Sequence, residues 1–215
     1  MNAHTALIVI DVQNCFCSGG NLAVAGGEQV VPLINQLASR FENVVITQDW
    51  HPRGHISFAS SHAGKRPYDR ISLPYGEQVL WPDHAVQGTL DAALHADLAI
   101  THAQLLIRKG YHAHTDSYSA FMEADGITPT GLAGYLAARG IHTVYLCGLA
   151  TDFCVAASAV DARRAGLQAV VIEDACRAID LDGSLAAAWA RMTEAGARRV
   201  ASADVLGQPA SAALT

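Results

Sequence analysis

The stretch HTVYLCGLATDFCVAASAVDARRAG, residues 142–166, decides the fold. Residues 143–147 form a short run of β-branched and aromatic residues, which predicts a buried strand that ends near Gly148. From Val155 the pattern becomes alanine-rich with helical spacing, so we expect a helix to begin near Cys154. A strand that runs through a tight turn into a helix is a building unit of α/β sheets.

The position of Cys154 at the start of the predicted helix favours a reactive thiol. At the start of a helix, unpaired backbone N–H groups and the positive end of the helix dipole favour a thiolate over a thiol. The position therefore predicts a nucleophilic cysteine. Most free cysteines are instead small buried hydrophobic residues, and this stretch alone leaves both interpretations open.

The rest of the chain alternates between strand and helix patterns. Residues 6–10, ALIVI, are apolar throughout and too few for a helix, which is typical of a strand covered on both faces. We expect further strands at residues 43–46, 104–107, 169–172 and 199–203, helices at residues 28–40, 130–139 and 184–195, and a short helix or strand at residues 94–100. The alternation predicts a single α/β domain over residues 1–215, a doubly wound and mainly parallel sheet of about six strands with helices on both faces.

Two polar segments interrupt this alternation. Residues 50–90 are rich in His, Pro, Gly, Ser and aromatic residues without a sustained period, and residues 112–125 form a second polar loop. A loop as long as the first is usually functional or disordered, and its histidines and tryptophans favour function.

Composition limits the classes of partner. The 215 residues carry a formal net charge of -6 and no basic run, so we expect neither nucleic acid nor a membrane as a partner. The N-terminus lacks the features of a signal peptide, and the apolar runs are too short to span a bilayer. The five cysteines include no CxxC pair, which favours reduced thiols and a cytoplasmic location.

The predicted strand ends bring ionisable residues to one edge. In an open parallel sheet, ligands bind outside the carboxyl ends of the strands. Asp11, Lys109 and Cys154 would meet there as a triad in which Asp11 moves the proton, Lys109 orients the carboxylate and the thiolate attacks. The N–H groups of Ala150 and Cys154 would form an oxyanion hole. Taken singly, Asp11 could cap a turn and Lys109 could be a solvated strand end.

A second group of residues suits a metal ion. Asp49, His51, His55 and His84 offer one carboxylate and several imidazoles, which are ligands for zinc, iron or manganese. Their spacing matches no tight signature such as HExxH, so the residues alone leave the metal open.

Five motifs together resemble those of the nicotinamidase branch of the isochorismatase-like cysteine hydrolases. They are DVQNCF (11–16), DWHPRGH (49–55), WPDH (81–84), RKG (108–110) and CGLATDFCV (147–155). They occur in family order over nearly the whole chain. The resemblance implies a Rossmann-like three-layer fold, the triad described above, and one divalent metal, zinc being favoured over iron or manganese.

The resemblance also assigns the remaining site residues. The metal ligands would be Asp49, His51 and His84, with waters or His55 completing the shell. The family has a cis peptide bond before the oxyanion-hole alanine, here Ala150. The aromatic residues that hold a pyridine ring would be Phe16, Trp81 and Tyr118. Cys15 departs from the family, which commonly has Asp at this position.

The activity that the resemblance implies is hydrolysis of nicotinamide to nicotinate and ammonia through a cysteine thioester, with pyrazinamide as a further substrate and a place in NAD salvage. A homo-oligomer is compatible with the sequence. The alternatives are a related ureido or carbamoyl amidohydrolase, a metal-dependent hydrolase in which Cys154 is structural, and a flavodoxin-like binding module, which the missing GxGxxG fingerprint disfavours.

Overall fold

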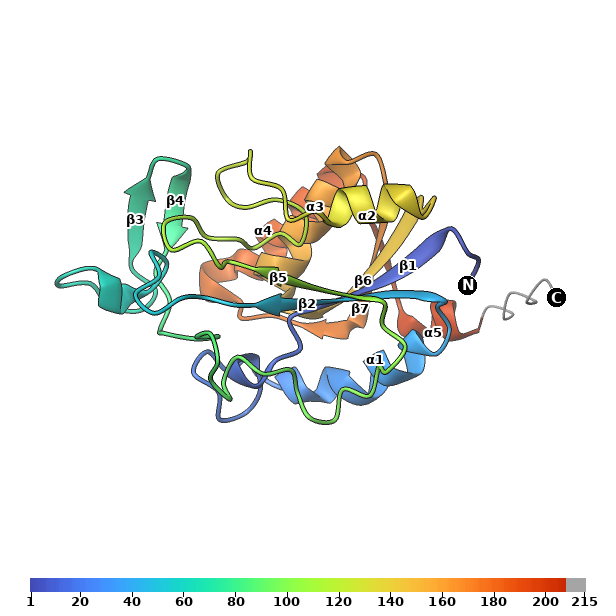
Figure 1. Ribbon diagram of the computed structural model, residues 1–215, viewed down its shortest axis with the longest axis horizontal. Coiled ribbons are helices and arrows are strands. Elements are labelled where there is room, and N and C mark those ends of the chain that lie inside the picture. Colours follow the sequence, from blue (N-terminus) through green and yellow to red (C-terminus); the bar gives the residue numbers. More distant parts are fainter. Residues whose placement is uncertain (208–215) are drawn as a thin grey trace.

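The computed structural model describes residues 1–207, and residues 208–215 of the predicted domain lie outside this range. A six-stranded sheet with the order β5-β2-β1-β6-β7-β8 runs through the centre (Figure 1), and all its neighbouring strands are parallel. The strands are β1 (Thr5–Ile10), β2 (Asn43–Asp49), β5 (Leu105–Lys109), β6 (Thr143–Leu149), β7 (Gln168–Arg177) and β8 (Arg198–Val200). The chain winds outward in one direction from β1 and in the other from β6, so the strand order reverses between them.

Helices cover both faces of the sheet, and the predicted three-layer α/β class is confirmed. They are α1 (Val30–Ala38), α2 (Leu132–Ala138), α3 (Ala156–Arg164), α4 (Ser184–Glu194) and α5 (Ser202–Leu206). Helices α1 and α5 lie on one face, whereas α2, α3 and α4 lie on the other (Figure 1). Short 3-10 turns occur at Asn14–Phe16, Gly27–Gln29, Ala59–Ser61 and Leu181–Gly183. No helix among residues 1–207 combines the length and the apolar character that crossing a membrane requires.

The apolar run in β1 is buried because it lies at the centre of this sandwich. Ala6, Leu7, Ile8, Val9 and Ile10 are all 0% exposed. They pack between the two helical layers, and this burial is the main favourable contribution to folding.

The secondary structure differs from the expectations at three places. Residues 94–100 form turns with neither helix nor strand, and Leu94 makes only an isolated bridge with Gln13. The last strand ends at Val200, because Asp174 accepts hydrogen bonds from the N–H and hydroxyl of Ser202 and thereby fixes the start of α5. The loop 50–90 contains an antiparallel hairpin, β3 (Arg70–Leu73) and β4 (Gly76–Val79), which the sequence pattern did not reveal.

The turn that carries the cysteine also differs from the expectation. Strand β6 continues to Leu149, and Thr151–Val155 forms one π-helical turn before α3 begins at Ala156. Such turns often occur at functional sites. Cys154 therefore lies inside a widened turn between strand and helix.

Candidate active site

Four side chains meet beyond the carboxyl ends of four strands. Asp11 follows β1, Asp49 ends β2, Lys109 ends β5, and Cys154 lies in the turn after β6. Strands β1 and β6 flank the point where the strand order reverses, which is the expected position of a ligand site in an open α/β sheet.

The ammonium group of Lys109 connects these side chains. Its Nζ lies 2.8 Å from Asp11 Oδ2, 3.0 Å from Asp49 Oδ1 and 3.4 Å from Cys154 Sγ, and it donates to the Ser117 carbonyl at 3.0 Å. The Lys109 side chain is 0% exposed. A buried ammonium is stable only when it is paired, and here two carboxylates compensate its charge.

The electrostatics suit a proton transfer between Cys154 and Asp11. Burial raises the pKa of the Cys154 thiol well above its usual range, although the nearby Lys109 opposes this shift. Burial also raises the pKa of the Asp11 carboxyl, again against the effect of Lys109. Lys109 Nζ contacts both Cys154 Sγ and Asp11 Oδ2, so Asp11 lies in position to take the thiol proton.

The orientation of Asp11 is fixed on its other side by Thr47. The Thr47 hydroxyl donates to Asp11 Oδ1 at 2.6 Å and accepts from the Asp11 N–H at 3.1 Å. The backbone of Asp11 is left-handed, with φ 47°. The carboxylate is thus held between Thr47 and Lys109.

The turn before Cys154 is crowded. The Leu149–Ala150 peptide bond is cis, as the family resemblance implied. Gly148 precedes it with φ 117°, and a Cβ atom there would lie 2.1 Å from the Ile10 carbonyl oxygen. Only glycine fits this approach between β6 and β1. The oxyanion hole at Ala150 and Cys154 stays a prediction.

The second predicted group also comes together. Asp49 Oδ2 lies 3.0 Å from His51 Nε2 and 3.3 Å from His84 Nε2, and all three residues are buried. His51 Nδ1 is 2.8 Å from the Gly110 carbonyl, and His84 Nδ1 is 2.9 Å from the Pro82 carbonyl. A carbonyl can only accept, so each Nδ1 carries the proton and each Nε2 is left for a metal. This donor set of one carboxylate and two imidazoles fits a divalent ion.

His55 packs against His51. The two imidazoles stack with 4.2 Å between centroids, and His55 contacts the Ser57 hydroxyl at 2.7 Å and the Thr115 carbonyl at 3.2 Å. Its potential ligand atom groups with those of His51 and Asp116, not with those of Asp49 and His84. A role for His55 as a ligand therefore stays a prediction.

The predicted aromatic residues surround the two groups. Phe16 packs edge-on against His84, with 5.6 Å between centroids, and the indole Nε1–H of Trp81 donates to the Tyr118 hydroxyl at 3.0 Å. Phe153, which the sequence analysis missed, lies 4.8 Å from Trp81 and 5.6 Å from Tyr118. The sequence signal that could have identified Phe153 is its position directly before Cys154.

Cys15 is an unreactive neighbour of this site. It is 0% exposed, and burial followed by the charge of Asp49 raises the pKa of its thiol well above the usual range. Burial raises the pKa of both thiols, but Cys154 Sγ lies 3.4 Å from the Lys109 ammonium, so the nucleophile assignment rests on Cys154.

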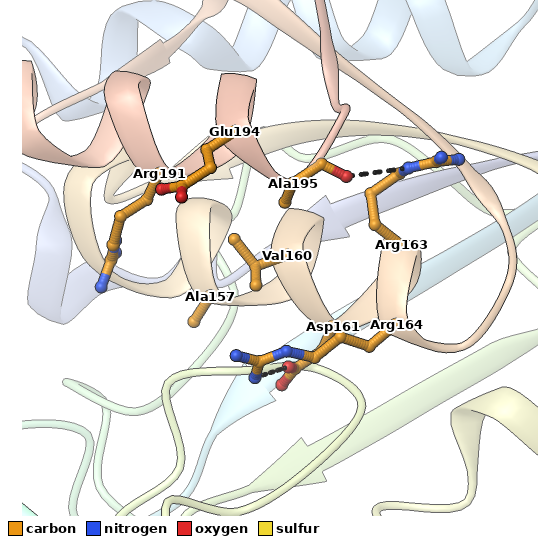
Figure 2. A pocket seen from close by; sticks show the side chains of 8 residues that line it. All are labelled: Ala157, Val160, Asp161, Arg163, Arg164, Arg191, Glu194 and Ala195. Carbon is orange, nitrogen blue, oxygen red and sulfur yellow. Dashed lines mark hydrogen bonds and ion pairs between the residues drawn. The ribbon is translucent and has the colours of Figure 1, made fainter.

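A separate cavity of about 610 Å³ lies between α3 and α4 (Figure 2). None of the predicted site residues lines it. Arg163 in its wall donates to the carbonyls of Ala195 and Leu167, and Arg164 pairs with Asp161. Because these charges are satisfied within the fold, this cavity is a less suitable site than the cluster at the strand ends.

The chain is similar to several known proteins. It is 63% identical over 203 residues to the nicotinamidase of Acinetobacter baylyi, covering 94% of this chain and 95% of that protein. A solved nicotinamidase and pyrazinamidase of Acinetobacter baumanii superposes with a TM-score of 0.95 at 60% identity, covering 95% and 99% of the two chains. An L. infantum protein solved with nicotinate gives a TM-score of 0.82 at 40% identity, covering 94% and 96%.

A more distant structure carries a metal. The pyrazinamidase of Pyrococcus horikoshii, solved in complex with zinc, has a TM-score of 0.74 at 33% identity and covers 92% of this chain and 99% of that one. The model of the isochorismatase domain matches residues 5–204, which include every residue described in this site. The chain belongs to the isochorismatase domain family.

Proposed function

We propose that this protein is a nicotinamidase that hydrolyses nicotinamide to nicotinate and ammonia through a thioester on Cys154. The observation that carries this proposal is the contact of one buried ammonium, Lys109 Nζ, with Asp11, Asp49 and Cys154. This contact connects the nucleophile Cys154 and its base Asp11 to Asp49, one of the residues that can hold a metal. The similarity to curated nicotinamidases over almost the whole chain supports the substrate.

The first half of the reaction forms the thioester. Asp11 takes the thiol proton while Cys154 Sγ bonds to the carboxamide carbon. Lys109 stays charged, because Asp11 and Asp49 raise the pKa of its ammonium well above the usual range despite burial. The N–H groups of Ala150 and Cys154 are proposed to hold the oxyanion, and each such donor is worth about 3 kcal/mol.

The second half returns the enzyme to its starting state. The tetrahedral intermediate expels ammonia, which receives the proton that Asp11 holds. A water molecule then attacks the thioester carbon and gives one proton to Asp11. The carbon–sulfur bond breaks to give nicotinic acid, which releases its proton to solvent and leaves as nicotinate, and Asp11 returns its own proton to the thiolate of Cys154.

The metal ligands are proposed to be Asp49, His51 and His84, with zinc as the ion. When bound, a divalent ion supplies a Lewis-acidic contact for the pyridine nitrogen of the substrate. The ring would be held by Phe16, Trp81 and Tyr118, and we add Phe153 because it packs against two of them. The five free and buried cysteines suit a reducing compartment, and we place the protein in the cytoplasm.

Ammonia release from nicotinamide tests the proposal. We expect the purified protein to release ammonia, and the Cys154→Ala variant to lose at least about 10³-fold in kcat. Chelation should mainly raise KM, because the metal is proposed to position the ring. No ammonia from metal-loaded wild type would refute the assignment, and normal turnover by Cys154→Ala would point to metal-dependent hydrolysis without a thioester.

A further inference from the structure

The β3–β4 hairpin reaches the candidate site through one side chain, Gln78. The hairpin stands apart from the central sheet (Figure 1), and its outer residues, such as Arg70 and Glu77, are exposed. Gln78, near its end, is by contrast 1% exposed, and the chain runs on through Leu80 into Trp81. The hairpin therefore ends at the aromatic wall described above.

The Gln78 carboxamide has four polar partners within hydrogen-bonding distance, three of them at Nε2, which has two N–H groups to donate. Its Nε2 donates to Asp116 Oδ2 and to the Val79 carbonyl, both at 2.7 Å, and it lies 3.1 Å from the Tyr118 hydroxyl. Its Oε1 accepts from the Tyr75 hydroxyl at 3.0 Å. A carboxylate and a carbonyl can only accept, so the NH₂ group must face them and the orientation of the amide is fixed.

This one amide holds two aromatic residues from different segments. The Tyr118 hydroxyl lies within hydrogen-bonding distance of Gln78 and also accepts from Trp81 Nε1. Tyr118 and Phe153 also line a cavity of about 370 Å³ that Val79 of the hairpin borders, but Trp81 and Cys154 do not line it. What ties the hairpin to the predicted ring-binding residues is therefore the contact of Gln78 with Tyr118, which in turn accepts from Trp81.

We propose that Gln78 is a positioning residue that sets the spacing of Tyr118 and Trp81 and thereby determines how tightly an aromatic ring is held. It acts through Tyr118 and Trp81, and none of its hydrogen bonds within residues 1–207 goes directly to Asp11, Lys109 or Cys154. This inference rests on the proposed function, since the ring in question is that of nicotinamide. If Gln78 has this role, its substitution should weaken binding of the ring without changing the chemistry at Cys154.

The test compares Gln78→Leu with a matched control, Gln36→Leu, at an exposed position of α1. We expect Gln78→Leu to raise KM for nicotinamide about tenfold, which corresponds to about 1.4 kcal/mol, while kcat stays within about threefold. The rate at which iodoacetamide alkylates Cys154 should not change. An unchanged KM, or an alkylation rate that falls as far as KM rises, would overturn the inference.

A second set of variants tests the inference if Gln78→Leu does not fold. It exchanges the donor and the acceptor of the hydrogen bond between Gln78 and Asp116. Gln78→Glu places a second carboxylate against Asp116 and should raise KM further. In the double variant Gln78→Glu/Asp116→Asn, the new amide can donate to the new carboxylate, and we expect KM to fall at least threefold from the single variant. A double variant no better than Gln78→Glu would contradict the proposed hydrogen bond.

A measurement without nicotinamide separates this inference from the proposed function. The rate at which benzyl bromide alkylates Cys154, divided by the rate for iodoacetamide, reports how well the pocket holds an aromatic ring. Cys154→Ala protein gives the background from the other thiols. Gln78→Leu should lower this ratio even if wild type releases no ammonia, and an unchanged ratio would refute the role of Gln78.

Discussion

The Lys109 ammonium compensates two buried carboxylates, and its removal should be costly. In a Lys109→Met variant, Asp11 and Asp49 would face each other without the shared cation. Breaking a buried ion pair on one side typically costs about 3 to 5 kcal/mol. We expect urea denaturation to show a loss of this size in the free energy of unfolding, together with loss of ammonia release.

Lys65→Met provides the matched control for this variant. Lys65 is exposed, and its side chain has no ion pair or hydrogen bond to residues 1–207 in the structure. Its substitution should change the free energy of unfolding by less than about 0.5 kcal/mol. Equal effects of the two substitutions would show that the Lys109 contacts do not stabilise the fold.

His55 should make stability depend on pH. Burial, and then the neighbouring His51, lower the pKa of His55 to about 4. Between pH 6.5 and pH 4 the unfolded chain therefore binds a proton at this residue that the folded chain does not bind, so stability falls as pH falls through this window. We expect metal-free His55→Gln to show a shallower decline between pH 7 and pH 4.5 in urea denaturation. The slope difference is at most about 1.4 kcal/mol per pH unit. Parallel curves would contradict the lowered pKa.

Strand β6 depends on Gly148 near its end, whereas α2 contains a glycine, Gly134, that it does not need. In Gly148→Ala the new Cβ would meet the backbone of Ile10, so we expect a loss of more than about 3 kcal/mol or no folded protein. In Gly134→Ala nothing lies within 4 Å of the new Cβ, and alanine should stabilise α2 by about 0.5 to 1 kcal/mol. Thermal melts of both variants test this contrast. A tolerated Gly148→Ala would show that β1 and β6 can move apart.

The central elements could be predicted from the sequence because their residues are constrained by burial alone. The run at residues 6–10 is apolar throughout, and that pattern is enough to identify a covered strand. The hairpin was missed because β3 and β4 have four residues each. The alternation of polar and apolar residues in RISL, residues 70–73, is too short to stand out inside a long polar loop. The pairing of the hairpin depends on tertiary contacts such as those of Gln78.

The same distinction applies to the candidate site. The residues at strand ends, such as Asp11 and Lys109, could be placed together because parallel strands end at a common edge. The contacts of Phe153 and Gln78 could not, because they arise where a loop, a hairpin and a π-helical turn pack against one another. No local pattern encodes that packing.

Metal binding should stabilise the whole molecule, because Asp49, His51 and His84 come from a strand end and a distant loop. A ligand that binds only the folded state adds about 2.7 kcal/mol at a concentration one hundred times its Kd. We expect zinc to raise the Tm of chelator-treated protein, and His84→Ala to reduce this rise. Exposed His114 offers the control His114→Ala, which should respond like wild type. The same rise in wild type and His84→Ala would place the ion elsewhere.

The shared contact of Lys109 also restricts how this molecule can be redesigned. Asp49 and Cys154 both contact the Lys109 ammonium, so a change of charge among the proposed metal ligands would also alter the electrostatic field at the thiol. Replacing these ligands to obtain activity on another carboxamide would therefore also change the reactivity of the Cys154 thiol. The hydrogen bonds of Gln78 join the hairpin to Tyr118 and Asp116, and they reach Lys109 only indirectly, through Ser117, which follows Asp116. Substrate range is therefore most easily widened from the hairpin, and a directed-evolution library is best concentrated there.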